Sequence, residues 1–269
     1  MKKIITIFLV ALMMLSLFAC GTKQNDPAET KDDDLSYIQD KKKIVIGITE
    51  YAPMNYYDDA GKLVGFDTEF AEAVCEKLGV TPDFIVIDWN SKETELKAKA
   101  IDCIWNGLTV KEDRKENMAF TDSYLTNRQC VVIRAEDVDK YTDIASLANA
   151  AIVAEDGSAG ADAVKADLKG AKFTAVDAQS TALLEVKAKT ADACVIDISM
   201  AKAMTGAGTD FSDLMIVEAI EMMDEEYAIG FRLGSSAVEK FNSIIRDMLK
   251  DGTIDALAEK YNITDLLIK

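Results

Sequence analysis

The stretch "IVIGITEYAPMNYYDDAGKLVGFDTEFAEAVCEKLGVTPDFIVID" (residues 44–88) decides the fold. It begins with a short apolar run, continues into a segment with Phe66, Phe70 and Val74 at helical spacing, and ends in a second apolar run. A glycine follows the last helical position, where glycine commonly ends a helix. This order predicts two parallel strands joined by a helix, because parallel neighbours need a crossover connection.

The same alternation continues along the chain. A helix pattern at 92–100 and a strand pattern at 102–107 complete the first series. A second series has strand-like runs at 129–135, 151–160, 172–176, 193–198 and 214–220, a helix near 180–189, and two closing helix patterns at 237–252 and 253–262. We therefore predict an α/β fold with mostly parallel sheets flanked by helices, arranged as two lobes rather than one sheet.

The N-terminus "MKKIITIFLVALMMLSLFAC" (1–20) has the features of an export signal. Two lysines precede an uncharged, mostly apolar run that ends at a cysteine. "LFAC" resembles the lipobox of bacterial lipoproteins, which implies a signal peptide over 1–19 and an acylated Cys20. A plain transmembrane anchor is the alternative, although the run is somewhat shorter than the roughly 20 residues that span a bilayer. Both interpretations place the rest of the chain outside the cytoplasm.

Residues 20–40 are polar and acidic, which predicts a flexible tether. The other cysteines, at 75, 103, 130 and 194, are far apart, and the chain has no CxxC motif and no histidine. This pattern argues against zinc and leaves a disulfide open. We expect neither a metal nor a cofactor.

The charge balance excludes one class of partner. The chain has 47 Asp and Glu against 30 Lys and Arg, a formal net charge of -17. Nucleic-acid binding depends on cations that neutralise phosphates, and no long Lys/Arg cluster is present. We therefore expect no nucleic-acid partner.

Three predicted strands end in residues that suit a charged small molecule, and ligands of open α/β sheets bind beyond the carboxyl ends of strands. "WNGLT" (105–109) and "AEDGSAG" (154–160) offer small residues and backbone N–H groups at helix starts, which favour an anion. Arg114 adds a planar, bidentate grip for a carboxylate. Asp197, at the end of an apolar strand, suits an ammonium group. Together these groups predict a site for a zwitterion.

Each group also has a simpler interpretation. A surface arginine is commonly only solvated, and a Gly-Ser turn is commonly only a turn. Asp197 would equally serve as the N-cap of a helix through "SMAKAM". The joint occurrence of the three groups in one alternating fold favours the binding site.

Three longer blocks, at 42–80, 96–125 and 226–261, resemble the extracellular solute-binding proteins (family 3) of polar amino-acid ABC transporters in their lipoprotein form. The resemblance covers about 41–265. Its most specific part is 101–124, where Gly-x-Thr, an arginine five residues after the threonine, and "FTDSY" follow in the family's order. It implies a two-lobe clamshell of the type II periplasmic-binding-protein kind with two hinge crossings. Lobe 1 would hold 41–129 plus 224–269, and lobe 2 would hold 130–223.

The resemblance also implies roles for individual residues. The ligand α-carboxylate would be bound by Gly107, Thr109 and Arg114, with help from the backbone of Ser158 and Ala159, and the α-amino group by Asp197. Tyr51 would lie against the ligand and Trp89 would border it.

Three positions depart from the family. Met54 stands where an aromatic residue is common, and ordinary core packing is the alternative interpretation. Asn106 replaces a small residue beside the carboxylate site and would offer the ligand an amide. Glu155 stands where some glutamine-specific members have a lysine, which favours a donor-rich or cationic ligand; the alternative is a solvated loop acid.

The expected function is capture of a polar, possibly cationic, L-amino acid between two closing lobes and its delivery to an ABC transporter permease. Lipid on Cys20 would hold a monomer at the outer face of the cell membrane, on the cell surface or in the periplasm. Two alternatives remain open. One is an enzyme on the same scaffold, of the dehydratase kind, for which a chain without histidine lacks the commonest general acid or base. The other is a binding protein that presents its ligand to a sensor.

Overall fold

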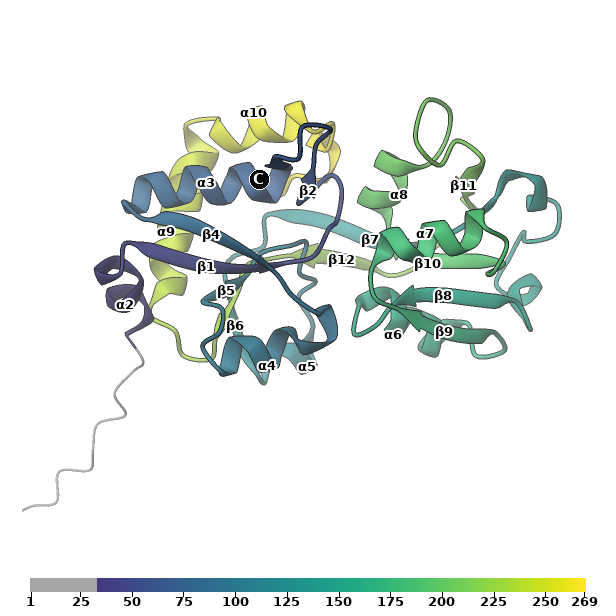
Figure 1. Cartoon of the computed structure of the whole chain (residues 1–269), viewed down its shortest axis with the longest axis horizontal. Helices are drawn as coiled ribbons and strands as arrows, with labels where there is room; N and C mark the ends of the chain where they lie inside the picture. Colours follow the sequence, from purple (N-terminus) through teal and green to yellow (C-terminus); the bar gives the residue numbers. More distant parts are fainter. Residues whose placement is uncertain (1–32) are drawn as a thin grey trace, which may run out of the picture. The chain divides into compact units, whose positions relative to one another are not determined.

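The computed structural model describes residues 33–269. The predicted signal peptide, Cys20 and the first part of the tether lie outside this range. The described part forms two lobes, each built on its own sheet with helices packed on the faces (Figure 1). This is the α/β, two-lobe architecture expected from the sequence.

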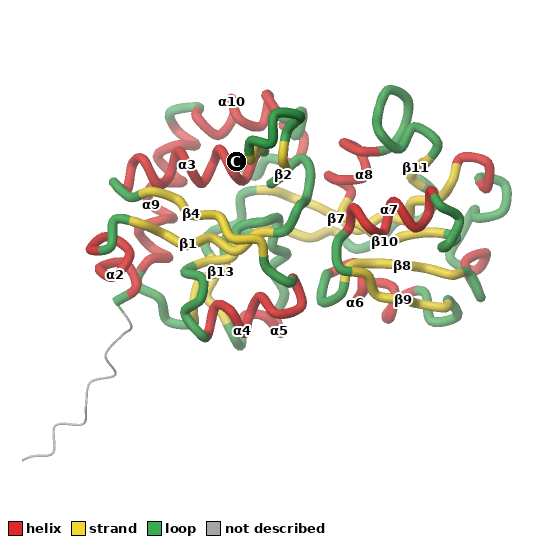
Figure 2. Tube along the Cα trace, in the orientation of Figure 1, coloured by secondary structure: helices red, strands yellow, loops and turns green. Residues whose placement is uncertain are grey.

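The first lobe contains a sheet with the strand order β4-β1-β5-β13-β6. Its core is the predicted strand–helix–strand unit, in which β1 and β4 pair in parallel on either side of the α3 connection. Figure 2 shows α3 and α10 on one side of these strands and α4 and α5 on the other. The strands and helices are β1 (Lys43–Ile48), β2 (Tyr56–Tyr57), β3 (Leu63–Val64), β4 (Thr81–Val86), β5 (Cys103–Ile104), β6 (Met118–Phe120), β13 (Gly230–Arg232), α2 (Asp34–Asp40), α3 (Phe66–Leu78), η1 (Trp89–Ser91), α4 (Lys92–Lys97), α5 (Glu112–Lys115), α9 (Ala237–Lys250), α10 (Thr253–Lys260) and η4 (Thr264–Leu266).

The second lobe contains a sheet with the order β11-β7-β10-β8-β9. Its elements are β7 (Leu125–Arg134), η2 (Ala135–Asp137), η3 (Ala145–Leu147), β8 (Ala151–Glu155), α6 (Ala159–Asp167), β9 (Lys172–Val176), α7 (Gln179–Lys187), β10 (Ala193–Asp197), α8 (Ile198–Met204) and β11 (Leu214–Ile216).

Both sheets are mixed rather than mostly parallel, which corrects the expectation from the sequence. The β4-β1-β5 and β10-β8-β9 parts are parallel. β13 runs antiparallel to both of its neighbours, and β7 runs antiparallel to β10 and β11. The antiparallel strands belong to segments that leave or re-enter a lobe, so their direction follows from the chain path and has no local signal in the sequence.

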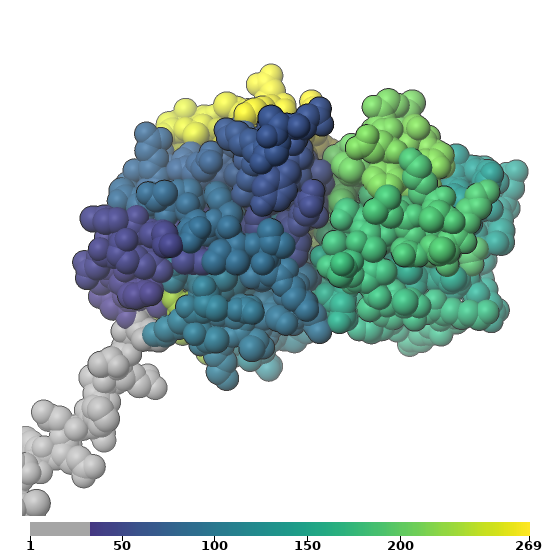
Figure 3. All heavy atoms as spheres, viewed as in Figure 1, coloured from purple at the N-terminus to yellow at the C-terminus, as the bar shows by residue number. Residues whose placement is uncertain are grey.

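Two strands connect the lobes. β7 extends from the first lobe into the sheet of the second, and β12 (Asp224–Tyr227) returns beside it, paired antiparallel with Leu125–Arg128 (Figure 1). A bridge between Thr109 and Tyr227 joins this ladder to the loop after β5. The space-filling view shows atoms of the two lobes in contact with each other (Figure 3).

An aromatic cluster fixes the position of the loop after β5. The ring of Phe70, on α3, packs edge-on against Trp105 at 5.0 Å and against Tyr124 at 5.5 Å between ring centroids. All three side chains are fully buried, and each such aromatic pair contributes about 0.5–1.5 kcal/mol beyond its buried area. Trp105 lies two residues before the Gly-x-Thr segment and Tyr124 directly precedes β7, so the core of the first lobe positions both.

The last part of the predicted tether is folded. α2 buries Ile38 in the core of the first lobe, and Asp33 caps the helix by accepting from the Ser36 N–H. Asp34 receives three hydrogen bonds of 2.9–3.1 Å from the guanidinium of Arg232, and both side chains are buried. The prediction of a flexible tether is therefore wrong for this part, because the acidic composition gave no indication that Ile38 and Asp34 are buried.

We expect Asp34→Asn to lower the free energy of unfolding by about 2–4 kcal/mol. The charge of Arg232 then stays buried with two backbone carbonyls, and its remaining acidic contact is the longer one to Asp102 at 3.5 Å. Urea unfolding of the purified protein measures the change. Asp40→Asn, at the exposed end of the same helix, is the matched control and should change stability by less than about 0.5 kcal/mol. Equal losses in both variants would contradict a specific role for the ion pair.

Candidate functional site

The ten site residues expected from the sequence line one small cavity between the lobes. Tyr51, Trp89, Asn106, Gly107, Thr109 and Arg114 come from the first lobe, and Glu155, Ser158, Ala159 and Asp197 from the second. In this closed arrangement the cavity has a volume of only about 10 Å³, about the space of one water molecule and far below that of ordinary small-molecule pockets. All of these residues except Ala159 are buried.

Arg114 presents a buried guanidinium without an acidic partner. The side chain is 5% exposed, and none of the ion pairs in residues 33–269 includes it. Its Nη1 donates to the Thr109 carbonyl at 2.9 Å, and its Nη2 donates to the Gly157 carbonyl of the other lobe at 3.2 Å. Burial lowers the pKa of Arg114, as expected for a cation removed from water. The guanidinium therefore retains donors for an anion in the cavity.

Thr109 adds a backbone donor beside Arg114. In its antiparallel bridge with Tyr227, the flanking hydrogen bonds are made by the neighbours of the two residues, so the N–H and C=O of Thr109 point away from β12. The carbonyl accepts from Arg114, and the N–H points to the same side. Its hydroxyl donates to the Glu225 carboxylate at 2.5 Å.

Gly107 differs from its expected role. Its N–H donates to the buried Asp67 carboxylate at 2.7 Å, so this donor is not free for a ligand. The glycine is required by space: at its φ of 56°, a Cβ atom would lie 2.6 Å from the Tyr51 ring and 3.1 Å from the Tyr227 ring. Gly107 thus permits the close approach of two tyrosines, of which Tyr51 lines the cavity.

Asp197 is a buried carboxylate surrounded by amides. Its Oδ1 accepts from Asn127 and Gln129 at 2.6 Å each, and its Oδ2 accepts from Gln179 at 2.5 Å. Burial raises the pKa of Asp197, and these amide hydrogen bonds oppose the rise. Asp197 occupies the N-cap position of α8, but its side chain makes no cap hydrogen bond. The simpler N-cap interpretation therefore does not account for this side chain.

Glu155 is not a solvated loop acid. The side chain is 2% exposed, and its Oε1 is buried without a hydrogen-bond partner. Burial, together with the nearby charge of Asp197, raises the pKa of Glu155 to about 8. A buried acceptor without a donor is costly, and a donor in the cavity would remove that cost.

Asn106 does not offer its amide to the cavity. Both of its amide N–H groups are used inside the first lobe, by the Thr49 carbonyl at 2.9 Å and Asn55 Oδ1 at 2.7 Å. Its oxygen accepts from the backbone and hydroxyl of Thr49. Asn106 thus holds the loop after β1 in place, and its expected role as an amide donor to the ligand is wrong.

Tyr51 connects the lobes beside the cavity. Its hydroxyl lies 2.5 Å from Ser199 Oγ of the second lobe and 2.7 Å from the Tyr227 hydroxyl. Trp89 lies on another wall, 5% exposed, in the short η1 turn before α4.

The second lobe places a helix start at the cavity. Ser158 caps α6 by accepting from the Ala161 N–H at 3.0 Å, while its own N–H donates to the Glu155 carbonyl. The next N–H, of Ala159, belongs to the first turn of α6, where backbone donors have no partner within the helix.

Gln179 was missed from the sequence although it lines the cavity. Its amide nitrogen donates to Asp197, and its oxygen accepts from the Asp197 N–H at 2.9 Å. A polar residue at the start of a predicted helix was the only signal, and many exposed residues share it.

Comparisons with known proteins show the family of this chain. The family model of the bacterial extracellular solute-binding proteins, family 3, matches residues 44–264. The chain belongs to this family. Like its structural neighbours it has the type II fold of periplasmic binding proteins, and the extracellular family places the lobes outside the cytoplasm.

This solute-binding protein is similar to several described proteins. It is 27% identical over 264 residues to the arginine-binding extracellular protein ArtP of Bacillus subtilis, covering 97% of this chain and 98% of ArtP. A substrate-binding protein of an ABC uptake transporter from Streptococcus pneumoniae, with bound histidine, has a TM-score of 0.81 at 28% identity, covering 89% and 100% of the two chains. The ancestral amino acid-binding protein AncCDT-1, a precursor of cyclohexadienyl dehydratase, has a TM-score of 0.77 at 26% identity, covering 84% and 98%.

Two further expectations concern membrane and cysteines. Within residues 33–269, no helix has the length and apolar character needed to cross a membrane. The cysteines of this range are all buried and unpaired, so the disulfide left open by the sequence is not formed among them.

The solute-binding protein without ligand should lose stability as the pH rises from about 5 to 9. Burial raises the pKa of Glu155 to about 8 and that of Glu225 to about 7. Each carboxyl group contributes its full stabilisation at pH values below its pKa in the unfolded chain. This stabilisation is lost as the pH rises through the higher pKa of the group in the folded protein. The free energy of unfolding of Glu155→Gln should therefore exceed that of the wild type by on the order of 2 kcal/mol at pH 9, but by little at pH 5.

Unfolding by urea at several pH values measures this difference. Glu76→Gln, on the exposed face of α3, is the control and should leave the pH profile unchanged. Parallel profiles for the wild type and Glu155→Gln would show that Glu155 is not buried as a carboxylate.

Proposed function

We propose that the protein binds an L-amino acid in the cavity between its lobes and delivers it to an ABC transporter permease. The observation that carries this proposal is the pair of buried opposite charges, Arg114 and Asp197, which share one small cavity and have no ion-pair partner among the described residues. A zwitterion supplies a counter-charge to each. Buried charges are tolerated when they are paired and hydrogen-bonded.

The α-carboxylate binds to the first lobe, against the guanidinium of Arg114 and the N–H of Thr109. The Ala159 N–H at the start of α6 completes this contact from the second lobe, where the helix dipole also favours an anion. The α-amino group binds Asp197, whose Oδ2 has one protein donor and so retains acceptor capacity. Gly107 serves through its lack of a side chain.

The ligand side chain points to Glu155 and carries a donor or a positive charge. The orphaned Oε1 of Glu155 supports this assignment, because a cationic group would pair with the carboxylate and lower its pKa. Two relatives support it as well: the Bacillus subtilis protein is named for arginine, and the Streptococcus pneumoniae structure holds histidine. Tyr51 and Trp89 form the aromatic walls of the pocket.

Capture proceeds by closure. Lobe 1, residues 41–129 and 224–269 together with α2, holds most carboxylate contacts, so the ligand enters an open form there. Lobe 2, residues 130–223, then adds Asp197, Glu155 and Ala159 only when the lobes meet, and these extra contacts shift the population to the closed form. β7 and β12 act as the hinge. A lipid on Cys20 keeps the protein, as a monomer, beside its permease.

The protein binds without catalysis. The neighbour AncCDT-1 is a precursor of a dehydratase, so the scaffold is compatible with an enzyme. Among the residues that line this cavity, however, the carboxylates have assigned partners in the bound ligand, and no histidine exists in the chain to act as general acid or base. Recovery of chemically unchanged ligand after prolonged incubation tests this point.

Calorimetric titration with the twenty amino acids, ornithine and cystine identifies the ligand. If no ligand binds with a dissociation constant below about 100 μM, which corresponds to a binding free energy of roughly -5.5 kcal/mol, the proposal fails. Arg114→Ala should weaken binding of every α-amino acid by more than about 100-fold, because the carboxylate loses a bidentate charge. Arg246→Ala, which removes a half-exposed surface arginine paired with Asp122, is the control and should bind normally.

Glu155→Gln tests the side-chain assignment. L-arginine should lose about 10- to 100-fold in affinity and L-glutamine less than about 3-fold, because only the cation needs the carboxylate. Competition titrations on the wild type and the variant give the ratio. Equal losses for the two ligands would contradict the placement of the side chain at Glu155.

A further inference from the structure

Lys92 is a buried cation that crosses from the first lobe to the second. It begins α4, is 4% exposed, and takes part in none of the ion pairs of residues 33–269. Its Nζ donates to the Trp89 carbonyl of its own lobe at 3.1 Å and to the Gly157 carbonyl of the other lobe at 2.9 Å. It also lies 5.0 Å from the centroid of the Trp89 ring. Lys92 does not line the cavity itself.

The Gly157 carbonyl that Lys92 contacts belongs to the turn from Glu155 to Ser158. This turn accepts hydrogen bonds from the first lobe and carries two residues that line the cavity. The same Gly157 oxygen accepts from Arg114 Nη2, so two cations of the first lobe share it. Gly157 has a φ of 68°, and a Cβ atom there would lie 2.9 Å from the Asn90 Cα. The turn joins Glu155 to Ser158, both of which line the cavity. Its position therefore decides where these two residues lie.

We propose that Lys92 is a positioning residue of the solute site, whose ammonium holds the turn from Glu155 to Ser158 against Trp89 and favours the closed arrangement of the lobes. The inference rests on the proposed function of the same cavity. When the lobes separate, the hydrogen bond to Trp89 remains and the one to Gly157 is lost. Hydrogen bonds from an ammonium are about twice as strong as neutral ones. Burial lowers the pKa of Lys92 to about 8, so the group stays charged at neutral pH.

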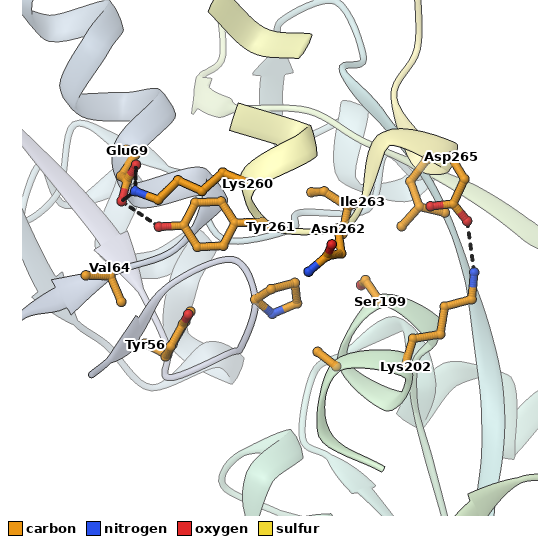
Figure 4. A pocket seen from close by; sticks show the side chains of 13 residues that line it. Tyr56, Val64, Glu69, Ser199, Lys202, Lys260, Tyr261, Asn262, Ile263 and Asp265 are labelled. Atoms are coloured by element: carbon orange, nitrogen blue, oxygen red, sulfur yellow. Dashed lines mark hydrogen bonds and ion pairs between the residues drawn. The ribbon is translucent and has the colours of Figure 1, made fainter. Parts of the chain in front are cut away.

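A second lysine provides a matched comparison. Lys202, on α8, pairs with Asp265 of the first lobe at 3.0 Å, beside a groove of about 560 Å³ (Figure 4). It also crosses between the lobes, but both partners are more than half exposed. Exposed ion pairs contribute little, because water and salt screen them. If closure depends on buried cations, the two lysines should behave differently.

Small-angle scattering of the ligand-free, full-length protein tests the proposal without any ligand. Lys92→Met keeps the apolar stem and removes the ammonium, and it should increase the radius of gyration relative to the wild type. Lys202→Met should scatter as the wild type does. A variant that unfolds cooperatively on heating qualifies as folded; if Lys92→Met does not, Lys92→Gln replaces it. Identical scattering from the wild type and the Lys92 variant overturns the proposal.

Release of L-arginine gives a second measurement. Stopped-flow tryptophan fluorescence, to which both Trp89 and Trp105 contribute, follows the release. Lys92→Met should speed dissociation about 5- to 10-fold and leave the association rate within about 2-fold, since the open form is unchanged. An unchanged dissociation rate overturns the proposal. If neither the wild type nor the variants bind any amino acid, the proposed function fails, and scattering alone still decides the role of Lys92.

Discussion

The pairing of β7 with β12 is the constraint on which the site depends. These strands connect the lobes, and their side chains reach both walls of the cavity: Asn127 and Gln129 on β7 hold Asp197, while Glu225 on β12 holds the hydroxyl of Thr109. The proposed anion and cation sites are thus attached to the same ladder. A change in the angle between the lobes would change the distance between the two charges, which would make closure and binding one process.

The cost of the closed, empty cavity lies in its charged groups. Burial and the like charge of Arg114 lower the pKa of Lys92, and burial and the like charge of Asp197 raise the pKa of Glu155. In both pairs the charged form is disfavoured, so like charges and burial act against the closed form. Amides and carbonyls reduce this cost but provide no full counter-charge. A zwitterion provides both counter-charges. The same buried groups, which lack partners until the ligand binds, would therefore select the ligand by its charge and close the lobes around it.

The sequence alone located the cavity because its main charged groups follow the ends of strands, and ligands of open α/β sheets generally bind there. It failed where the deciding contact is distant in the chain. The N–H of Gly107 is occupied by Asp67, forty residues earlier, and the amide of Asn106 by Thr49 and Asn55. The local composition also gave no indication of α2, because Ile38 contacts the core and Asp34 contacts Arg232, both far away in the sequence.

The net charge of -17 gives little information about the ligand, because the discriminating groups are few and buried. Glu155 illustrates the point. In the proposed binding mode, an amino acid whose side chain has no donor leaves its Oε1 without a partner, whereas a side chain with a donor or a positive charge satisfies it. Sites with a buried polar group discriminate strongly against ligands that leave the group unpaired, and only weakly against ligands that differ in apolar size. We therefore expect discrimination at this site to follow the charge and hydrogen-bond donors of the ligand side chain more than its length.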